Sequence, residues 1–179
     1  MKTESQTPSR LEMNLAFPDL LVKTHHGNVH LRSLIQNKRV IVVTNPSDMI
    51  PITKENRKEL VQSLKKIKKL NFHLIGFNRN TFDEHLRAIN WINSYLTDDL
   101  VFPVFYQPKN DVKTCLERDL GKEITLRNPV YFLDKTGCTR VVLEGFRATN
   151  DTLDRIVEQA SRLVLSEQPL QLGQSLRDN

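Results

Sequence analysis

Apolar residues occur along this chain in two patterns, short continuous runs and longer stretches in which they recur every three or four positions. The continuous runs are typical of buried strands, and they predict strands at 39–44, 72–77 and 128–134. In the stretch 53–70, Leu60, Leu64 and Ile67 are separated by four and three residues. This spacing places the three side chains on one face and predicts an amphipathic helix.

Turn and cap residues locate the remaining elements. Two hairpins are predicted, one within 15–31 and one between the strands 128–134 and 139–144. Pro103 has no backbone N–H to donate, so 102–106 is predicted to be a short edge strand. Polar caps, early acidic residues and apolar spacing predict a short helical turn at 33–37 and helices at 80–96, 110–120 and 150–166.

The order of these elements indicates a mixed α/β fold, because a hairpin is followed by alternating strands and helices, a second hairpin and a terminal helix. A length of 179 residues fits one domain. We expect a flexible leader at 1–12, a folded domain at 13–168 and a flexible tail at 169–179, since both ends are polar and lack periodicity.

Composition narrows the class of protein. No apolar run reaches the roughly 18 to 20 residues of a membrane helix, and the polar segment 1–10 lacks the apolar stretch of a secretory signal. We therefore expect a cytoplasmic protein without a membrane span. The formal net charge of +5 is compatible with an acidic partner but does not require one.

Several short motifs occur in one order along the chain. They are Phe-Pro-Asp-Leu at 17–20, the loop 44–53, Leu-Ile-Gly-Phe at 74–77 followed by Asp83, His85 and Leu86, Phe-Pro-Val at 102–104, and Arg127 before 130–132. In combination, over about residues 14–168, they resemble peroxiredoxins of the alkyl hydroperoxide reductase and thiol-specific antioxidant (AhpC/TSA) group. The resemblance implies a thioredoxin-like fold of peroxiredoxin type, with a central mixed β-sheet flanked by helices.

The loop 44–53 follows a predicted buried strand and opens a helix, the position at which open α/β sheets place their chemistry. In the family that the chain resembles, this loop reads Pro-x-x-x-Thr-x-x-Cys, and its Cys is the nucleophile that reduces peroxide. Pro46 matches the proline of that pattern. Ile50 stands in place of the Thr, and Thr53 stands in place of the Cys.

These replacements imply that peroxidase chemistry is lost. A threonine hydroxyl stays protonated at neutral pH, and its oxygen does not reduce a peroxide. Asn56 also stands where the family usually has Glu, so three central positions differ together. By resemblance, Arg127 remains as the guanidinium of the site. The remnant pocket then consists of Pro46, Ile50, Thr53 and Arg127, and it could hold a small anion or an oxygen-rich ligand.

The leading hypothesis is therefore a catalytically inactive pseudoenzyme that acts through binding or assembly. One alternative is a thiol-dependent peroxidase or oxidoreductase that uses Cys115 or Cys138. No Cys-x-x-Cys pair supports it. We expect Cys115 to be a buried residue of the helix 110–120, and Cys138 to be an exposed thiol near a hairpin turn.

A second alternative is a basic adaptor that binds nucleic acid or an acidic partner through the helix 53–70. The cations of that helix are Lys54, Arg57, Lys58, Lys65, Lys66, Lys68 and Lys69. Such a stripe is usually a solvated face. Because no aromatic residues are interleaved with these cations, we do not expect nucleic-acid binding.

No cofactor or metal site is expected. His25, His26 and His30 are close in sequence, but their stretch is not helical, so the spacing does not assure the one-face geometry of a metal pair. We expect His85 to be a surface or capping residue of its helix, and Trp91 to belong to the core or an interface.

A homodimer is expected by resemblance, formed either through an edge strand of the sheet or through loops around the site. The strand at 140–144 is the expected edge, because the backbone groups of an unpaired edge are available to a second chain.

Overall fold

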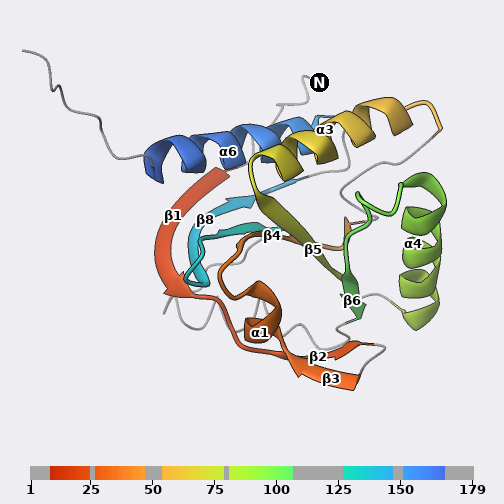
Figure 1. Cartoon of the computed structure of the whole chain (residues 1–179), viewed down its shortest axis with the longest axis horizontal. Helices are drawn as coiled ribbons and strands as arrows, with labels where there is room; N and C mark the ends of the chain where they lie inside the picture. Colours follow the sequence, from red (N-terminus) through yellow and green to blue (C-terminus); the bar gives the residue numbers. More distant parts are fainter. Residues whose placement is uncertain are drawn as a thin grey trace, which may run out of the picture.

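A mixed β-sheet forms the centre of the molecule (Figure 1). The computed structural model describes residues 9–24, 27–46, 54–78, 81–106, 127–146 and 151–167. Within them, a six-stranded sheet has the order β1-β8-β7-β4-β5-β6. Its strands are β1 (Ser9–Ala16), β4 (Arg39–Thr44), β5 (Phe72–Asn78), β6 (Val104–Tyr106), β7 (Val130–Leu133) and β8 (Cys138–Glu144). β4, β5 and β6 pair in parallel, whereas β7 is antiparallel to both β4 and β8.

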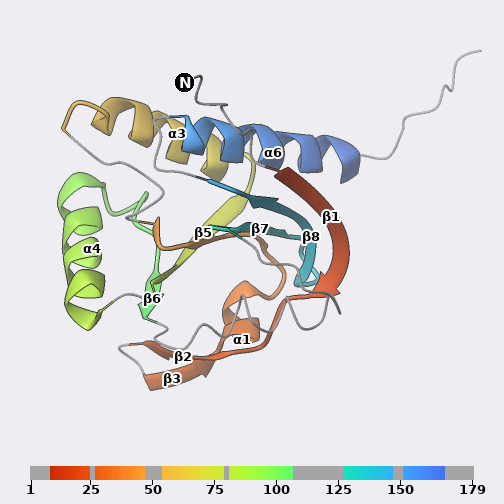
Figure 2. The same ribbon diagram turned by 180° about the vertical axis from the view of Figure 1, so that it is seen from behind.

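Helices cover both faces of this sheet. The helices α3 (Arg57–Lys69) and α6 (Thr152–Glu167) lie side by side across one face (Figures 1 and 2). On the other side lie the short helix α1 (Leu31–Ile35) and a hairpin, and α4 (Phe82–Tyr95) lies beside the β6 edge. The hairpin consists of β2 (Leu21–Thr24) and β3 (Gly27–His30).

The central strand β4 contributes to two apolar cores. Ile41 and Val43 belong to the cluster that α3 and α6 cover, whereas Val40 and Val42 belong to the cluster on the α1 side. Successive side chains of a strand point to opposite faces, so a strand covered on both sides needs apolar residues at every position. This explains why the run at 39–44 is continuous rather than alternating.

Most predicted elements within the described residues are confirmed with small shifts of their ends. The predicted helix at 53–70 is α3, in which Leu60, Leu64 and Ile67 are buried. Helix α4 begins with a capping box, in which the Thr81 hydroxyl accepts from the Glu84 backbone N–H and the Glu84 carboxylate accepts from the Thr81 backbone N–H. Both predicted hairpins are present, and the predicted edge strand is β6.

The expected start of the folded domain at residue 13 is wrong. Residues 9–12 lie in β1, where Ser9 is opposite Glu144 and Glu12 is opposite Val141 of β8. The Ser9 hydroxyl also donates to the Glu144 carboxylate at 2.6 Å. A polar segment without helical periodicity can still form an outer strand, because the neighbouring strand supplies its backbone partners.

The expectation that 140–144 is a free edge is wrong for the same reason. Strand β8 is paired on one side with β7 and on the other with β1. The edges of the described sheet are therefore β1 and β6.

Some predictions fall outside the described residues. These are the helix at 110–120 with Cys115, the tail at 169–179, the leader residues 1–8, and the site residues Ile50 and Thr53. Across the part of the chain that the structure describes, no helix is long and apolar enough to cross a membrane.

Candidate functional site

The loop that follows β4 is anchored to both neighbouring strands. The buried Thr44 hydroxyl donates to the carbonyl of Pro129, just before β7, at 3.0 Å. The Asn45 backbone N–H donates to the carbonyl of Phe77 in β5 at 2.6 Å. Asn45 has a φ of 48°, a left-handed conformation that asparagine tolerates better than most residues. These contacts turn the chain sharply at the carboxyl end of β4.

Pro46 is buried at this turn and packs against β5. A Cβ built on Gly76 would lie 2.9 Å from Cγ of Pro46 and 3.0 Å from Cγ2 of Val104. Only a glycine allows the proline ring and the β6 side chain to approach the β5 backbone so closely. The position of Pro46 thus depends on a residue 30 positions later in the chain.

Arg127 lies at the same end of the sheet as Pro46. In the antiparallel pair of β4 and β7, Val43 is opposite Val130, and Pro46 and Arg127 are each three residues beyond this pair in the same direction. The Arg127 carbonyl accepts from the Gly145 backbone N–H at 2.7 Å. Its side chain is exposed, and within the described residues the guanidinium forms no ion pair.

Comparison with known proteins agrees with this arrangement. Residues 13–141 match the model of the AhpC/TSA family, which is well over half of the chain. The chain belongs to the AhpC/TSA family. Its relatives include the peroxiredoxin of Hyperthermus butylicus, with 26% identity over 153 residues that cover 84% of this chain and 66% of the relative. Peroxiredoxin 1 of Picrophilus torridus is 28% identical over 128 residues, which cover 71% of this chain and 56% of the relative. The chain thus spans less than two thirds of the length of some curated peroxiredoxins.

Solved structures show the same fold. A mutant of peroxiredoxin 6 of Arenicola marina matches with a TM-score of 0.64 at 15% identity, over 88% of this chain and 76% of that chain. The yeast mitochondrial 1-Cys peroxiredoxin matches with a TM-score of 0.62 at 14% identity, over 93% of this chain and 84% of that chain. The thioredoxin-like fold of peroxiredoxin type, inferred from the sequence motifs, is confirmed.

Two of the four residues predicted for the remnant pocket, Pro46 and Arg127, lie at the same end of the sheet in this AhpC/TSA chain. The other two, Ile50 and Thr53, lie outside the described residues. Asn56 precedes the first turn of α3, and its carbonyl accepts from the Leu60 backbone N–H at 3.0 Å. Its side chain does not cap the helix.

Cys138 lies at the opposite end of the sheet from Pro46. It is the first residue of β8 and is half-buried, whereas the sequence predicted a more exposed surface thiol. The next residue, Thr139, is opposite Leu133, which in turn is opposite Val40 of β4. From Val40 to Thr44, the last residue of β4, the chain advances four residues, or about 13 Å at a strand rise of about 3.3 Å.

The expectation that His85 is a surface or capping residue is wrong. The side chain is 7% exposed, and its ring lies 5.5 Å from that of Tyr106 and 6.0 Å from that of Phe82. Burial lowers the pKa of His85, and its Nδ1 has no hydrogen-bond partner among the described residues. His85, Ile89 and Ile92 are spaced by four and three residues, a signal that could have placed the histidine on the inner face of α4.

Trp91, on the same helix, is half-buried and packs against the apolar core, as expected. Of the three histidines considered for a metal site, only His30 is described. Its Nδ1 lies 3.3 Å from the Asp19 carboxylate. Within the described residues, no group of three or more potential ligands is close enough to hold a metal ion.

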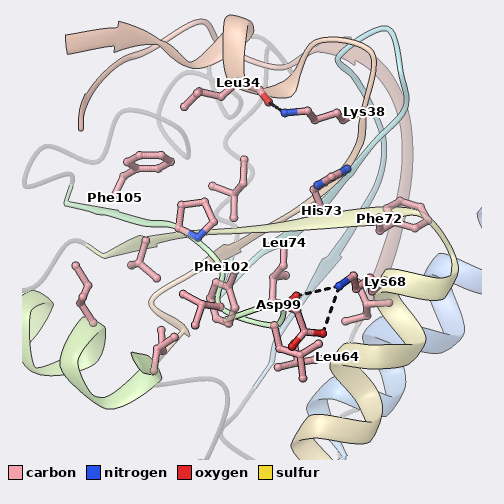
Figure 3. Close-up of a pocket in the computed structure, with 18 of the residues that line it drawn as sticks. Leu34, Lys38, Leu64, Lys68, Phe72, His73, Leu74, Asp99, Phe102 and Phe105 are labelled. Carbon is pink, nitrogen blue, oxygen red and sulfur yellow. Dashed lines mark hydrogen bonds and ion pairs between the residues drawn. The ribbon is translucent and has the colours of Figure 1, made fainter. Parts of the chain in front are cut away.

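Sequence reasoning missed a cavity of about 1190 Å³ near the β6 edge (Figure 3). It extends along the first half of β5 and is lined by residues of α3, α4, β5 and the segment before β6. Neither Pro46 nor Arg127 lines it. The two described residues of the remnant pocket are therefore not part of the cavity, and no local sequence pattern indicates it.

Proposed function

We propose that this chain is a peroxiredoxin-fold protein that has lost peroxidase catalysis and acts through binding or assembly. Thr53 stands where the family pattern has the peroxidatic Cys. A neutral hydroxyl cannot replace a thiolate, because peroxide reduction requires a sulfur that accepts the transferred oxygen. Pro46 and Arg127 persist at the end of the sheet where that chemistry would take place.

The position of Cys138 is the observation that carries this proposal. A thiol peroxidase that uses this site would need a sulfur at the carboxyl end of β4, within contact distance of a peroxide bound by Arg127. Cys138 instead lies at the other end of the sheet, separated from that end by the length of β4 from Val40 to Thr44, about 13 Å at a strand rise of about 3.3 Å per residue. This distance argues against a thiol enzyme that uses Cys138 at the remnant pocket.

Hydrogen peroxide consumption by the purified full chain tests the proposal. We expect the same rate from the wild-type protein and from a Cys115→Ser/Cys138→Ser variant, which removes both thiols. A separate variant, Thr53→Cys, should gain the ability to consume peroxide. The matched variant Thr53→Ser should not. A wild-type rate above that of the thiol-free variant would overturn the proposal in favour of a thiol peroxidase.

We further propose that the remnant pocket binds a small anion. The exposed Arg127 guanidinium forms no ion pair within the described residues, so its charge is available to a carboxylate or phosphate. Ile50 and Thr53 would complete the pocket with apolar and hydroxyl groups.

The basic-adaptor alternative has one supporting observation. The seven cations of the segment 54–69 are all exposed, and within the described residues only Arg57 and Lys68 donate to a neighbouring segment. Retention of the protein on immobilised DNA that falls steeply with added salt would support this alternative.

We also propose that the chain forms a homodimer and that it is located in the cytoplasm. Since β8 is covered, strand pairing between two copies would use the outer edge of β1 or of β6, with the loops around Arg127 as the other route. Sedimentation of the purified chain measures the dimer, and cell fractionation measures the location.

A further inference from the structure

Strand β5 is paired along most of its length with β4, but along only its last three residues with β6. Toward β4 the register runs from Phe72 to Phe77, but toward β6 it begins at Gly76. Within the described residues, the stretch 72–75 therefore has no strand on its outer side. Phe72, Leu74 and Ile75 of this stretch are buried, and His73 is exposed. Unpaired strand edges bind extended segments where their backbone N–H and C=O groups remain available for pairing.

The 1190 Å³ cavity surrounds this unpaired edge. Its lining includes His73 and Ile75 from one face of β5, and Phe72 and Leu74 from the other. Figure 3 shows His73 and Leu74 on opposite sides of the strand. A single cavity can contact both faces of a strand only by passing around its edge. The cavity thus occupies the place where β6 would continue if it were longer.

The backbone of β5 is oriented to bind a strand at this place. The Gly76 N–H donates to the carbonyl of Pro103 at 2.8 Å, so the main-chain groups of Gly76 point toward the outer side. Backbone direction alternates along a strand with a period of two. The N–H and C=O groups of Leu74 and Phe72 therefore point to the same side, into the cavity.

The two faces of the cavity differ in chemistry. Below β5 in Figure 3 the lining is apolar, with Leu64 of α3 beneath Leu74 and Phe102 beside it. Lys68 also lines this side, but its Nζ already pairs with Asp99 at 3.3 Å, so the charge of Lys68 is neutralised.

The side above β5 carries free positive charge. Lys38 lies near His73, and its Nζ donates only to the carbonyl of Leu34, at 3.0 Å (Figure 3). Lys23 also lines the cavity and comes from β2, which lies on the α1 side of the sheet (Figure 1). Neither lysine forms an ion pair with a described residue. Burial, and secondly the positive charge of Lys38, lowers the pKa of His73. A negative charge placed here would offset the charge of Lys38.

We propose that this groove, defined by the edge of 72–75 and the lining named above, binds an extended segment of a partner protein in which apolar and acidic residues alternate. A strand added beside β5 sends successive side chains to opposite faces. One set would pack on Leu64, Leu74 and Phe102, and the other would meet Lys23 and Lys38. The free edge of four residues spans about 13 Å, which fits four residues of the bound segment.

Fluorescence anisotropy with labelled peptides and the full-length chain tests the proposal. The probe is a peptide of alternating Glu and Val, and the control peptide has Lys in place of Glu. We expect saturable binding of the Glu peptide alone. N-methylation of the amides on one edge of the Glu peptide should abolish binding, whereas methylation of the opposite edge should preserve it, because only one edge pairs with β5.

Two charge-reversal variants locate the site without altering the core. Lys38→Glu should weaken binding of the Glu peptide at least tenfold, and the matched Lys66→Glu, at an exposed position of α3 outside the groove, should change it less than twofold. The proposal would be overturned if the two variants had equal effects or if no saturable binding were observed. It would also be overturned if both methylated peptides bound equally well. The chain could instead form a dimer that blocks the groove and that the peptide does not dissociate. This result would overturn the proposal, because the groove would then hold a second copy of the chain. Since the groove contains neither Pro46 nor Arg127, these outcomes are independent of peroxidase activity.

Discussion

Pro46 and Gly76 are packed so tightly that a single methyl group would not fit between them. A Cβ on Gly76 would lie 2.9 Å from Cγ of Pro46, closer than real Cβ contacts. The proline belongs to the loop after β4, and the glycine lies in the adjacent strand β5. This contact links the loop of the remnant pocket to the middle of the sheet.

We predict that Gly76→Ala destabilises the protein. The added methyl must displace Pro46 or Val104, and overpacking of this kind costs about 1–3 kcal/mol in the free energy of unfolding. Urea denaturation measures the loss. The double variant Gly76→Ala/Pro46→Ala should recover part of it, since one of the two clashes is removed. A Gly76→Ala protein as stable as the wild type would contradict the packing described.

The Asp134 carboxylate should make stability depend on acidic pH. It accepts from the backbone N–H and hydroxyl of Thr136, from the backbone N–H of Cys138, and from Nε of Arg140 at 2.6 Å. Burial alone would raise the pKa of Asp134, but these hydrogen bonds outweigh burial and lower it below its ordinary value of 3.8.

Because the folded pKa of Asp134 lies below the unfolded one, this contribution is present above about pH 3.8 and is lost as pH falls through the folded value. Asp134→Asn should reduce stability at pH 7 by about 1–3 kcal/mol and flatten the acid side of the stability profile. Denaturation curves between pH 2 and pH 7 measure both effects. An unchanged acid slope in Asp134→Asn would rule out this role.

His85 should make the stability of the protein depend on pH in a second range, closer to neutral pH. Burial lowers its pKa from 6.5, so the folded protein favours the neutral imidazole. Stability from this group is fully present above the unfolded pKa of about 6.5 and is lost as pH falls toward the folded value. His85→Phe should remove that loss while keeping the ring contacts with Phe82 and Tyr106.

Thermal unfolding at pH 5 and pH 7 measures the effect of His85→Phe. The gap in melting temperature between the two pH values should narrow. His73 also has a lowered pKa, owing to burial and to Lys38, so His73→Gln is the control that measures its separate share. A gap that His85→Phe leaves unchanged would show that His85 does not contribute.

Removal of residues 9–12, the first half of β1, should expose the part of the β8 edge that they cover. A chain that begins at residue 13 loses the pairing of 9–12 with β8 and the contact of Arg10 Nε with Gln159 at 3.0 Å. We expect the free energy of unfolding to fall by about 1–3 kcal/mol, as for the loss of one buried apolar side chain such as Leu11. We also expect copies of the chain to associate through the uncovered edge of β8. A chain that begins at residue 9 is the matched control. Light scattering that shows equal association of both chains would contradict the prediction.

Arg127→Gln should weaken phosphate binding at the remnant pocket about tenfold, a change of about 1.4 kcal/mol. The guanidinium supplies charge and paired donors that the neutral amide lacks. Isothermal titration with inorganic phosphate measures the affinity, with Arg87→Gln on the exposed side of α4 as the control. Phosphate binding that both variants leave intact would remove Arg127 from the site.

The sequence by itself determined the elements and the family. Continuous apolar runs marked the strands buried on both faces, and the spacing of Leu60, Leu64 and Ile67 marked α3, because both signals come from residues close together in the chain. The motifs around Pro46 and Arg127 were sufficient for the fold and for one end of the candidate site. These motifs were sufficient because proteins that share a family pattern also share the tertiary arrangement of the residues in it.

Only the tertiary structure decided which strands lie at the edges, which polar side chains are buried and where the cavity lies. Ser9 is opposite Glu144, 135 residues later, and no local periodicity encodes such a pairing. His85 is buried because Phe82 and Tyr106 close around it, and Tyr106 comes from another element. The groove along β5 exists because β6 begins its pairing only at Gly76. Each of these features depends on contacts between distant segments, which the order of residues within any one segment cannot specify.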